Sequence, residues 1–174
     1  EFSLVGKVAM VTGAARHDGI GAACAQALAD AGAKVVVADV MDEQGRQVAD
    51  SINAAGGSAV YRHLDVRSEA AWMRAIADTV HELGGFDVLV NNAGNFFAGF
   101  FEELGPEQVR NQIETLLFGP MNVTRAVLPV MRKQRAGLLL TISSIAGIAG
   151  QMFCTAYAAA KFGIEGWMES LAPE

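Results

Sequence analysis

The feature that most constrains the fold is a glycine-rich loop directly after the first apolar run. Residues 8–12 (VAMVT) are typical of a buried strand, and residues 12–21 (TGAARHDGIG) lead from it into a helical pattern. Glycines at such a junction allow a tight turn and let the backbone approach a pyrophosphate at the N-terminus of the next helix. The loop therefore predicts phosphate binding, although a plain turn between a strand and a helix also often contains glycine.

The rest of the chain continues to alternate between short β-branched runs and helical periods. Further strands are expected at 34–40, 58–64, 87–90 and 137–143. Helical patterns occupy about 19–31, 42–55, 68–83, 106–135 and 155–171. The first of them is expected to bury Ile20, Cys24, Ala27, Leu28 and Ala31, and Pro120 is expected to kink the fourth. The predicted fold class is α/β: a doubly wound parallel sheet, Rossmann-like, in three α/β/α layers with five strands and six helices.

Composition narrows the classes of protein that fit. The chain has 174 residues, 52% of them hydrophobic, which suits one domain with a sizeable core. A net charge of −6 and the lack of any basic block argue against nucleic acid as a partner. No apolar run approaches the roughly 18 residues of a membrane span and no leader opens the chain, so we expect no membrane partner.

Cysteine and histidine usage adds two expectations. Cys24 and Cys154 lie far apart and form no CxxC, which fits a reducing, cytoplasmic location. His17, His63 and His81 show no ligand spacing, so no metal is expected.

Asp39 ends the second predicted strand and bears on the choice of dinucleotide. A carboxylate there can accept hydrogen bonds from the ribose hydroxyls and repels a 2′-phosphate, which favours NAD over NADP. Two alternatives stay open: an aspartate at a strand end is often only solvated, and Arg16 in the loop could bind a 2′-phosphate.

Tyr157 and Lys161 are one helical turn apart and share a face with Ile164, Met168 and Leu171. A neighbouring ammonium lowers the pKa of a phenol, which can then exchange a proton with an alcohol oxygen at working pH. The alternative is a tyrosine and a lysine at the edge of the core, with the lysine reaching out to water.

Polar residues also end two later strands, at the edge of the sheet where open α/β proteins bind ligands. Ser143 and Ser144 follow the fifth strand, and Ser144 could hold a substrate carbonyl or simply help to turn the chain. Asn91-Asn92-Ala93-Gly94 follows the fourth, where the amides could join neighbouring backbone beside a cofactor.

Together these residues resemble the short-chain dehydrogenase/reductase family over nearly the whole chain. The resemblance rests on Thr12-Gly13 with Gly19-Ile20-Gly21, Asp39, Asp65-Val66, Asn91 to Gly94, Ser144, and Tyr157 with Lys161. It implies NAD(P)-dependent hydride transfer between an alcohol and a ketone.

The resemblance also implies roles for single residues. Tyr157 would be the general acid/base, Lys161 would bind the nicotinamide ribose and assist the tyrosine, and Ser144 would polarise the carbonyl. The cofactor-binding candidates are Gly13, Arg16, Gly19, Ile20, Gly21, Asp39, Asp65, Val66, Asn91, Ala93, Gly94, Tyr157 and Lys161.

The sequence departs from the family pattern in its loop and its long helix. His17-Asp18 lengthens the glycine loop and adds a carboxylate near the expected phosphates. Leu116 stands where the family has an asparagine, three residues before Gly119. Pro120 lacks an N–H group, so the carbonyl of Leu116 should be free to hold a water of the family's proton relay. We expect an impaired relay and intact cofactor binding.

The chain ends at Glu174, just after the sixth predicted helix, whereas family members continue into a substrate lid. Residues 1–174 are therefore predicted to be a single dinucleotide-binding domain, truncated before the lid. The fifth strand would form a bare apolar edge covered by other residues or another chain. Apolar surface on the last two helices suggests a homo-oligomer, and family members are commonly dimers or tetramers.

Two classes of function remain open at this point. The first is an oxidoreductase for a small alcohol or ketone, with an apolar substrate wall formed by residues 95–101 and 151–153. The four phenylalanines within residues 95–101 could equally be a subunit contact or a lid over the core. The second is a catalytically impaired nucleotide-binding or assembly module, because of the truncation and Leu116.

Overall fold

The computed structural model describes residues 3–174 and contains one five-stranded parallel sheet. The strands are β1 (Val8–Thr12), β2 (Lys34–Asp39), β3 (Ser58–His63), β4 (Val88–Asn91) and β5 (Leu138–Thr141), in the order β3-β2-β1-β4-β5. The chain reverses its direction of winding between β1 and β4, so the sheet is doubly wound as predicted. A crevice is expected at that switch point.

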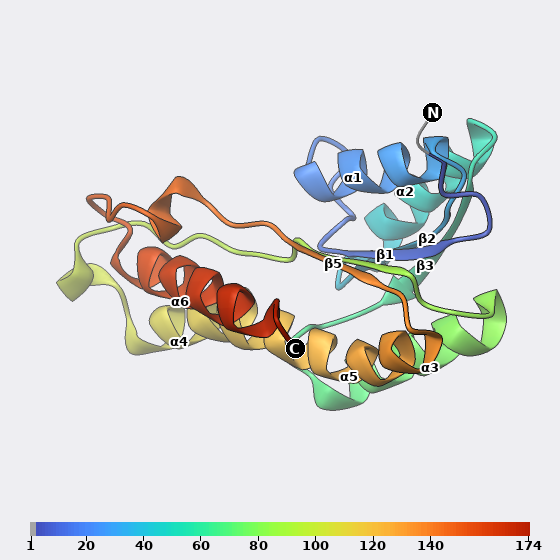
Figure 1. Ribbon diagram of the computed structural model, residues 1–174. Coiled ribbons are helices and arrows are strands. Elements are labelled where there is room, and N and C mark those ends of the chain that lie inside the picture. The colour runs from blue at the N-terminus through green and yellow to red at the C-terminus, as the bar shows by residue number, and fades with distance from the viewer. Residues whose placement is uncertain (1–2) are drawn as a thin grey trace.

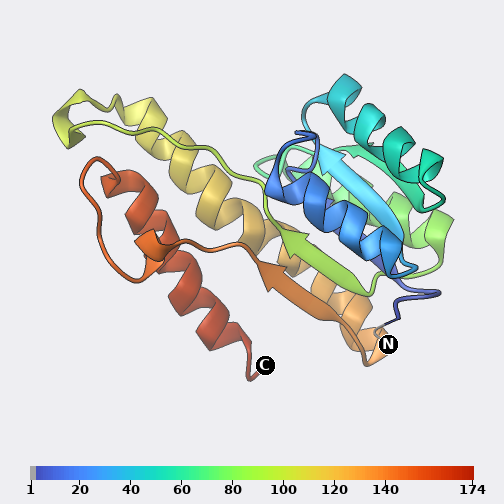
Figure 2. The same cartoon turned by 90° about the horizontal axis from the view of Figure 1, so that it is seen from above.

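Helices cover both faces of the sheet. In Figure 1, α1 (Ile20–Asp30) and α2 (Asp42–Ala54) lie on one face, and α3 (Glu69–Leu83) and α5 (Gly119–Gln134) lie on the other. The remaining helices, α4 (Pro106–Ile113) and α6 (Thr155–Leu171), lie side by side beyond the sheet, as both views show (Figures 1 and 2). This three-layer arrangement confirms the predicted fold class.

The sheet is buried on both sides because alternate residues of each strand enter different apolar clusters. In β1, Ala9 and Val11 pack toward α1 and α2, whereas Met10 packs with residues of α3 and α5. Continuous apolar runs are needed in strands of this kind, which is why the strands stand out in the sequence.

The buried face of α1 differs from the prediction. Its buried residues are Gly21, Ala22, Ala25 and Ala29, whereas Ile20 is 63% exposed. The helix approaches the sheet through its smallest side chains, which allows close packing. The expectation was therefore wrong for Ile20 and for the exposed Ala27, whereas Cys24 and Leu28 are partly buried and pack against the core as predicted.

The long helical segment is interrupted just before Pro120. Residues Glu114–Phe118 form a π-helical turn, and the N–H of Gly119 donates to the carbonyl of Glu114, five residues earlier. Such turns are common sites of helix bending, and Pro120 then lies in the first turn of α5, where a missing N–H group costs little. The sequence predicted a kink at Pro120, and the structure has a π turn directly before it.

The strand β5 forms one edge of the sheet, as predicted from its late position in the chain. Leu138 and Leu140 are 48% and 43% exposed on this strand. Across residues 3–174, no helix combines the length and the apolar character that crossing a membrane requires.

Candidate active site and nucleotide cleft

A cleft of about 560 Å³ lies at the carboxyl ends of β1 to β4, where the sheet reverses its winding. This size is typical of a small-molecule site. Most of the predicted cofactor-binding residues line it: Gly13, Arg16, Gly19, Ile20, Gly21, Asp39, Asp65, Val66, Ala93 and Gly94. Segments far apart in the sequence are therefore brought together at the expected edge of the sheet.

Two side chains at the ends of β1 and β4 connect these strands at the base of the cleft. The Thr12 hydroxyl accepts hydrogen bonds from the backbone N–H groups of Asn92 and Ala93, at 3.0 and 3.1 Å. The Asn92 amide in turn donates to the carbonyls of Thr12 and Gly13, at 3.0 and 2.8 Å. These bonds hold together the two strand ends between which the cleft opens.

The backbone segments around this cleft approach each other so closely that two positions can only hold glycine. Gly13 has a φ of +65°, and a Cβ on it would lie 2.5 Å from the Cα of Ala93. A Cβ on Gly21 would lie 2.5 Å from both the Asn92 amide nitrogen and the Gly13 carbonyl oxygen. The loop glycines therefore serve a close approach of backbone, which goes beyond the needs of a plain turn.

The first turn of α1 points into the cleft with free backbone donors. Gly19 precedes the helix without a side-chain cap, so the first N–H groups of the helix are left for solvent or a ligand. A helix end of this kind favours an anion such as a phosphate.

Asp39 is 8% exposed and connects three segments of the cleft wall. One carboxylate oxygen accepts from the N–H of Ala15 at 2.9 Å, and the other accepts from the N–H of Met41 at 3.1 Å. Each carboxylate oxygen has a second lone pair, so the side chain can still accept further hydrogen bonds from a ligand.

Arg16, the other residue that bears on a 2′-phosphate, is paired within its own loop. Its guanidinium lies 3.3 Å from the Asp18 carboxylate, and both side chains are exposed. The Arg16 side chain, through its hydrogen bond and charge, lowers the pKa of Asp18. The Asp18 carboxylate, from the two extra loop residues, would therefore compete with a 2′-phosphate for the Arg16 guanidinium. An exposed ion pair of this kind is nevertheless weak.

Asp65 lies in the cleft with a partner that the sequence did not point to. Arg67 binds both carboxylate oxygens of Asp65, at 3.0 and 2.8 Å, and also donates its backbone N–H. The hydrogen bond from Arg67 lowers the pKa of Asp65. Arg67 also lines the cleft, so a fixed ion pair forms part of its wall.

Asn91 is not on the cleft wall. It is 3% exposed, and its amide donates to the Thr124 hydroxyl on α5 at 3.1 Å. Because successive side chains of a strand point to opposite faces, the neighbouring Asn92 turns toward the glycine loop instead.

Tyr157 and Lys161 come together at the start of α6, outside the lining of the cleft. The Lys161 ammonium lies 5.6 Å from the centre of the Tyr157 ring and donates to the Ile142 carbonyl at 2.6 Å. Burial lowers the pKa of Lys161. The side chain is therefore a buried cation held against the end of β5, which contradicts the alternative of a lysine reaching out to water.

The serines after β5 divide into a capping residue and an unsatisfied one. The Ser144 hydroxyl accepts from the N–H of Ala146 at 3.2 Å and caps a short 3-10 turn. The Ser143 hydroxyl is buried and has no hydrogen-bond partner among residues 3–174. Both alternatives for Ser144 remain compatible with this arrangement, because a capping hydroxyl still has a proton to donate.

Residues from the segment after β4 and from the α4 region complete the cleft: Asn95 had been assigned to the substrate wall, and Asn111 and Thr115 were missed from the sequence. Asn95, Asn111 and Thr115 line it, and the Asn95 amide donates to the Asn111 side chain at 2.7 Å. The next residue, Phe96, packs edge-on against Tyr157, with ring centres 4.9 Å apart. The close spacing of Asn111 and Thr115 on one helical face was the available signal.

Comparisons with known proteins agree with this geometry. A family model described as short chain dehydrogenase matches residues 7–174. The chain is 42% identical over 172 residues to the trans-4-hydroxycyclohexanecarboxylate dehydrogenase of Sinomonas cyclohexanicum, covering 95% of this chain and 65% of that protein. It is 40% identical over 171 residues to the 3-alpha-(or 20-beta)-hydroxysteroid dehydrogenase of Mycobacterium tuberculosis (strain ATCC 25618 / H37Rv), covering 98% and 64%.

A solved structure extends the likeness to three dimensions. A metagenomic short-chain oxidoreductase in complex with NADP superposes with a TM-score of 0.92 at 38% identity, covering 98% of this chain and 76% of that one. The chain thus spans slightly less than two thirds of the length of the two curated relatives.

The close approach at Gly13 can be tested by adding one methyl group. Gly13→Ala should destabilise the fold by about 3 kcal/mol, because it combines a strained φ with a backbone clash against Ala93. Gly6→Ala is the matched control: its φ is +79° and no atom of the described residues would lie within 4 Å of an added Cβ, so only about 1 kcal/mol is expected. Urea unfolding measures both, and equal losses would contradict the close approach.

The buried charge of Lys161 predicts a pH-dependent stability. Its pKa in the folded state lies below the ordinary value of 10.5, so the folded protein binds fewer protons than the unfolded chain just below that pH. Stability should therefore rise with pH through this window, and Lys161→Met should remove that rise and stabilise the fold at neutral pH. Lys133→Met, at an exposed position, serves as the control. A stability gain in Lys161→Met that stays constant up to pH 10.5 would contradict the assignment.

Proposed function

Since this chain belongs to the short-chain dehydrogenase family, we propose that it carries the cofactor site and the catalytic residues of an NAD(P)-dependent oxidoreductase. The reaction would interconvert a secondary alcohol and a ketone, with residues 1–174 acting as a single dinucleotide-binding domain. The observation that carries the proposal is the pairing of Tyr157 with the buried Lys161 ammonium, beside a cleft whose glycines clear space for backbone and phosphate.

The cleft fits a dinucleotide in its donor set as well as in its size. The free N–H groups at the start of α1 would bind the pyrophosphate, and Asp39 would accept the hydroxyls of the adenine-side ribose. Asp65 and Val66 would flank the adenine, and Ala93 and Gly94 would lie along the cofactor. When bound, NAD(P) supplies a hydride acceptor or donor.

Tyr157 is proposed to move the proton of the reaction. In alcohol oxidation the phenolate oxygen of Tyr157 would take the hydroxyl proton, the carbon that bears the hydroxyl would give up its hydride to the acceptor that bound NAD(P) would supply, and a ketone would remain. In reduction the phenol returns that proton to the carbonyl oxygen. Lys161 would hold positive charge beside the phenol, and the Ser144 hydroxyl would donate to the substrate oxygen.

NAD is the proposed cofactor in preference to NADP. Asp39 is fixed by two backbone hydrogen bonds, so its carboxylate cannot easily move away from a 2′-phosphate. Arg16, which could favour that phosphate, already pairs with Asp18. The NADP complex of the related oxidoreductase makes a direct comparison of both dinucleotides necessary.

The proposed substrate is a small apolar alcohol whose carbinol carbon belongs to a ring. Phe96 packs against Tyr157, and Phe100 packs against Phe153 with ring centres 4.9 Å apart, so apolar surface begins beside the phenol. The names of the two curated relatives, a hydroxycyclohexanecarboxylate and a hydroxysteroid dehydrogenase, also point to cyclic alcohols. Cyclohexanol and cyclohexanone are suitable first probes.

Tyr157→Phe tests the proton-transfer role in the full-length protein. We expect kcat for cyclohexanone reduction to fall at least about 100-fold, because general acid catalysis is lost, while NADH affinity is retained. Absorbance at the NADH band and NADH fluorescence measure the two quantities. Ser170→Ala removes an exposed hydroxyl from the same helix and should leave both unchanged. Full turnover in Tyr157→Phe would disprove the role.

Leu116 decides between a full enzyme and the alternative of an impaired module. Leu116 is 4% exposed within the π turn, at the position where the family has an asparagine. Leu116→Asn should raise turnover if the relay is impaired, with NADH affinity unchanged. Leu117→Asn, one position along on a half-buried face, controls for the general effect of a new amide. Unchanged rates in Leu116→Asn would discard the impaired relay.

A further inference from the structure

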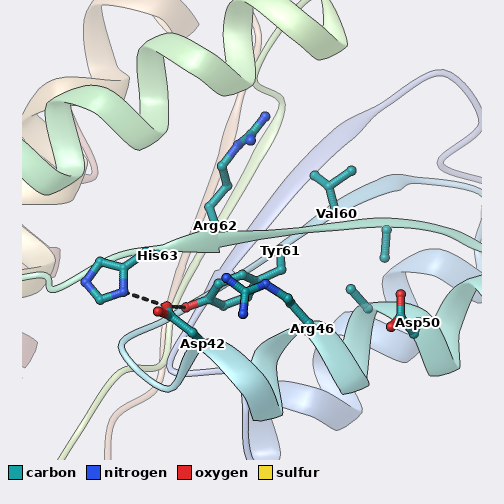
Figure 3. A pocket seen from close by; sticks show the side chains of 9 residues that line it. Asp42, Arg46, Asp50, Val60, Tyr61, Arg62 and His63 are labelled. Carbon is teal, nitrogen blue, oxygen red and sulfur yellow. Dashed lines mark hydrogen bonds and ion pairs between the residues drawn. The ribbon is translucent and has the colours of Figure 1, made fainter.

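A polar cluster outside the cleft lies on the side of β3 that faces α2. Figure 3 shows Tyr61 and His63 pointing from β3 toward Asp42 at the start of α2, whereas Arg62 projects from the opposite side of the strand. Nothing in the proposed reaction uses these three residues. They are nonetheless next to the cleft, because Met41 and Leu64, their sequence neighbours, both line it.

A single carboxylate oxygen joins the cluster. Oδ1 of Asp42 lies 2.7 Å from the Tyr61 hydroxyl and 2.8 Å from Nδ1 of His63. The hydrogen bonds from Tyr61 and His63 lower the pKa of Asp42, so it acts as an acceptor only. Burial and the Asp42 carboxylate raise the pKa of Tyr61, which therefore keeps its proton and remains a donor.

The Tyr61 hydroxyl also reaches the backbone of the proposed ribose-binding residue. It lies 2.7 Å from the carbonyl oxygen of Asp39, which also accepts from the N–H of Leu64 at 2.9 Å. The hydroxyl has one proton for two acceptors. The proton is therefore shared between the Asp42 carboxylate and the Asp39 carbonyl, and because His63 also donates to Asp42, the carboxylate does not depend on Tyr61 alone.

The ring of Tyr61 is held in place by a helix built around it. Gly45 lies in α2, and a Cβ on it would come within 2.2 Å of the Tyr61 ring. Glycine inside a helix costs about 1 kcal/mol relative to alanine, so α2 gives up stability where the ring packs. The Arg46 guanidinium lies 5.4 Å from the ring centre.

We propose that Tyr61 is a positioning residue for Asp39: its hydroxyl, oriented by Asp42 and His63, fixes the backbone from which the Asp39 carboxylate reaches the nucleotide ribose. The inference rests on the proposed dinucleotide function and adds a residue outside the cleft to it. Asp39 is then held from both ends, by Tyr61 at its carbonyl and by the N–H groups of Ala15 and Met41 at its carboxylate.

The cluster itself is a poor candidate for a separate ligand site. The hollow beside it, of about 480 Å³, is lined by charges of both signs. Asp42 is used by Tyr61 and His63, and Arg62 pairs with Glu82 from the other side of β3. No single ligand charge would be favoured there, whereas a positioning role accounts for the shared proton and for Gly45.

The test compares NADH and NADPH affinity in the full-length protein, its Tyr61→Phe variant and a Thr79→Val control. Tyr61→Phe keeps the ring and removes only the hydroxyl, so NADH affinity should fall roughly threefold to tenfold, the usual effect of one hydrogen bond. NADPH affinity should fall less or rise, because a loosened Asp39 excludes a 2′-phosphate less well. The KM for NAD(H) should rise with kcat unchanged. Thr79→Val removes a hydroxyl that donates to the Ala75 carbonyl in α3 and should change neither affinity.

The outcomes distinguish a failure of the positioning role of Tyr61 from a failure of the proposed function. If the parent binds NADH and Tyr61→Phe binds NADH and NADPH as the parent does, the positioning role is overturned while the proposed function stands. If both affinities fall by the same factor, the loss is general and the role is also overturned. If the parent binds neither dinucleotide, the proposed function fails and the role fails with it.

A second variant keeps the hydroxyl and moves the ring. Gly45→Ala should displace the Tyr61 ring and therefore lower NADH affinity, as Tyr61→Phe does. This loss is expected even though alanine is the better helix former. Gly166→Ala, at a helical glycine with open space around it, is the matched control and should leave affinity unchanged. Parent-like discrimination between NADH and NADPH in Gly45→Ala would overturn the role.

Discussion

The cleft depends on one close approach, between the end of β1 and the segment that follows β4. There the backbone of Gly13 lies so near Ala93 that no side chain fits, and the Thr12 hydroxyl and the Asn92 amide bridge the two segments. Adjacent parallel strands whose connections leave on opposite faces must separate beyond such a point, and the space between them becomes a binding crevice. Every cleft residue contributed by β2, β3 and the α4 region is positioned relative to this junction.

The sequence was sufficient for the fold and for most of the residues at the strand ends of the cleft, because both are local in the chain. A strand covered on two faces needs a continuous apolar run, and its carboxyl end is where the run stops, so Asp39, Asp65 and Asn92 could be placed at one edge without coordinates. The π turn was anticipated only as a kink, because the missing N–H group of Pro120 predicts a lost hydrogen bond and leaves the new pairing undetermined.

What could not be predicted depends on close approach between distant segments. Residue size pointed to Ile20 as core in α1, yet small residues face the sheet and Ile20 faces the cleft. The group formed by Tyr61, His63 and Asp42 requires the register of β3 against α2, which the sequence does not contain. Gly45 was the single local sign of it, since a glycine inside an amphipathic helix often marks a bulky neighbour.

Asn95 and Phe96 connect the two halves of the proposed site, because Tyr157 and Lys161 do not line the cleft themselves. Asn95 borders the cleft and bonds to α4, and Phe96 meets the Tyr157 ring almost at right angles, with an interplanar angle of 82°. Two successive residues after β4 therefore touch the nucleotide side and the proton-transfer side. A shift of this short segment would therefore change the distance between the cleft and the Tyr157 ring without altering the residues of either.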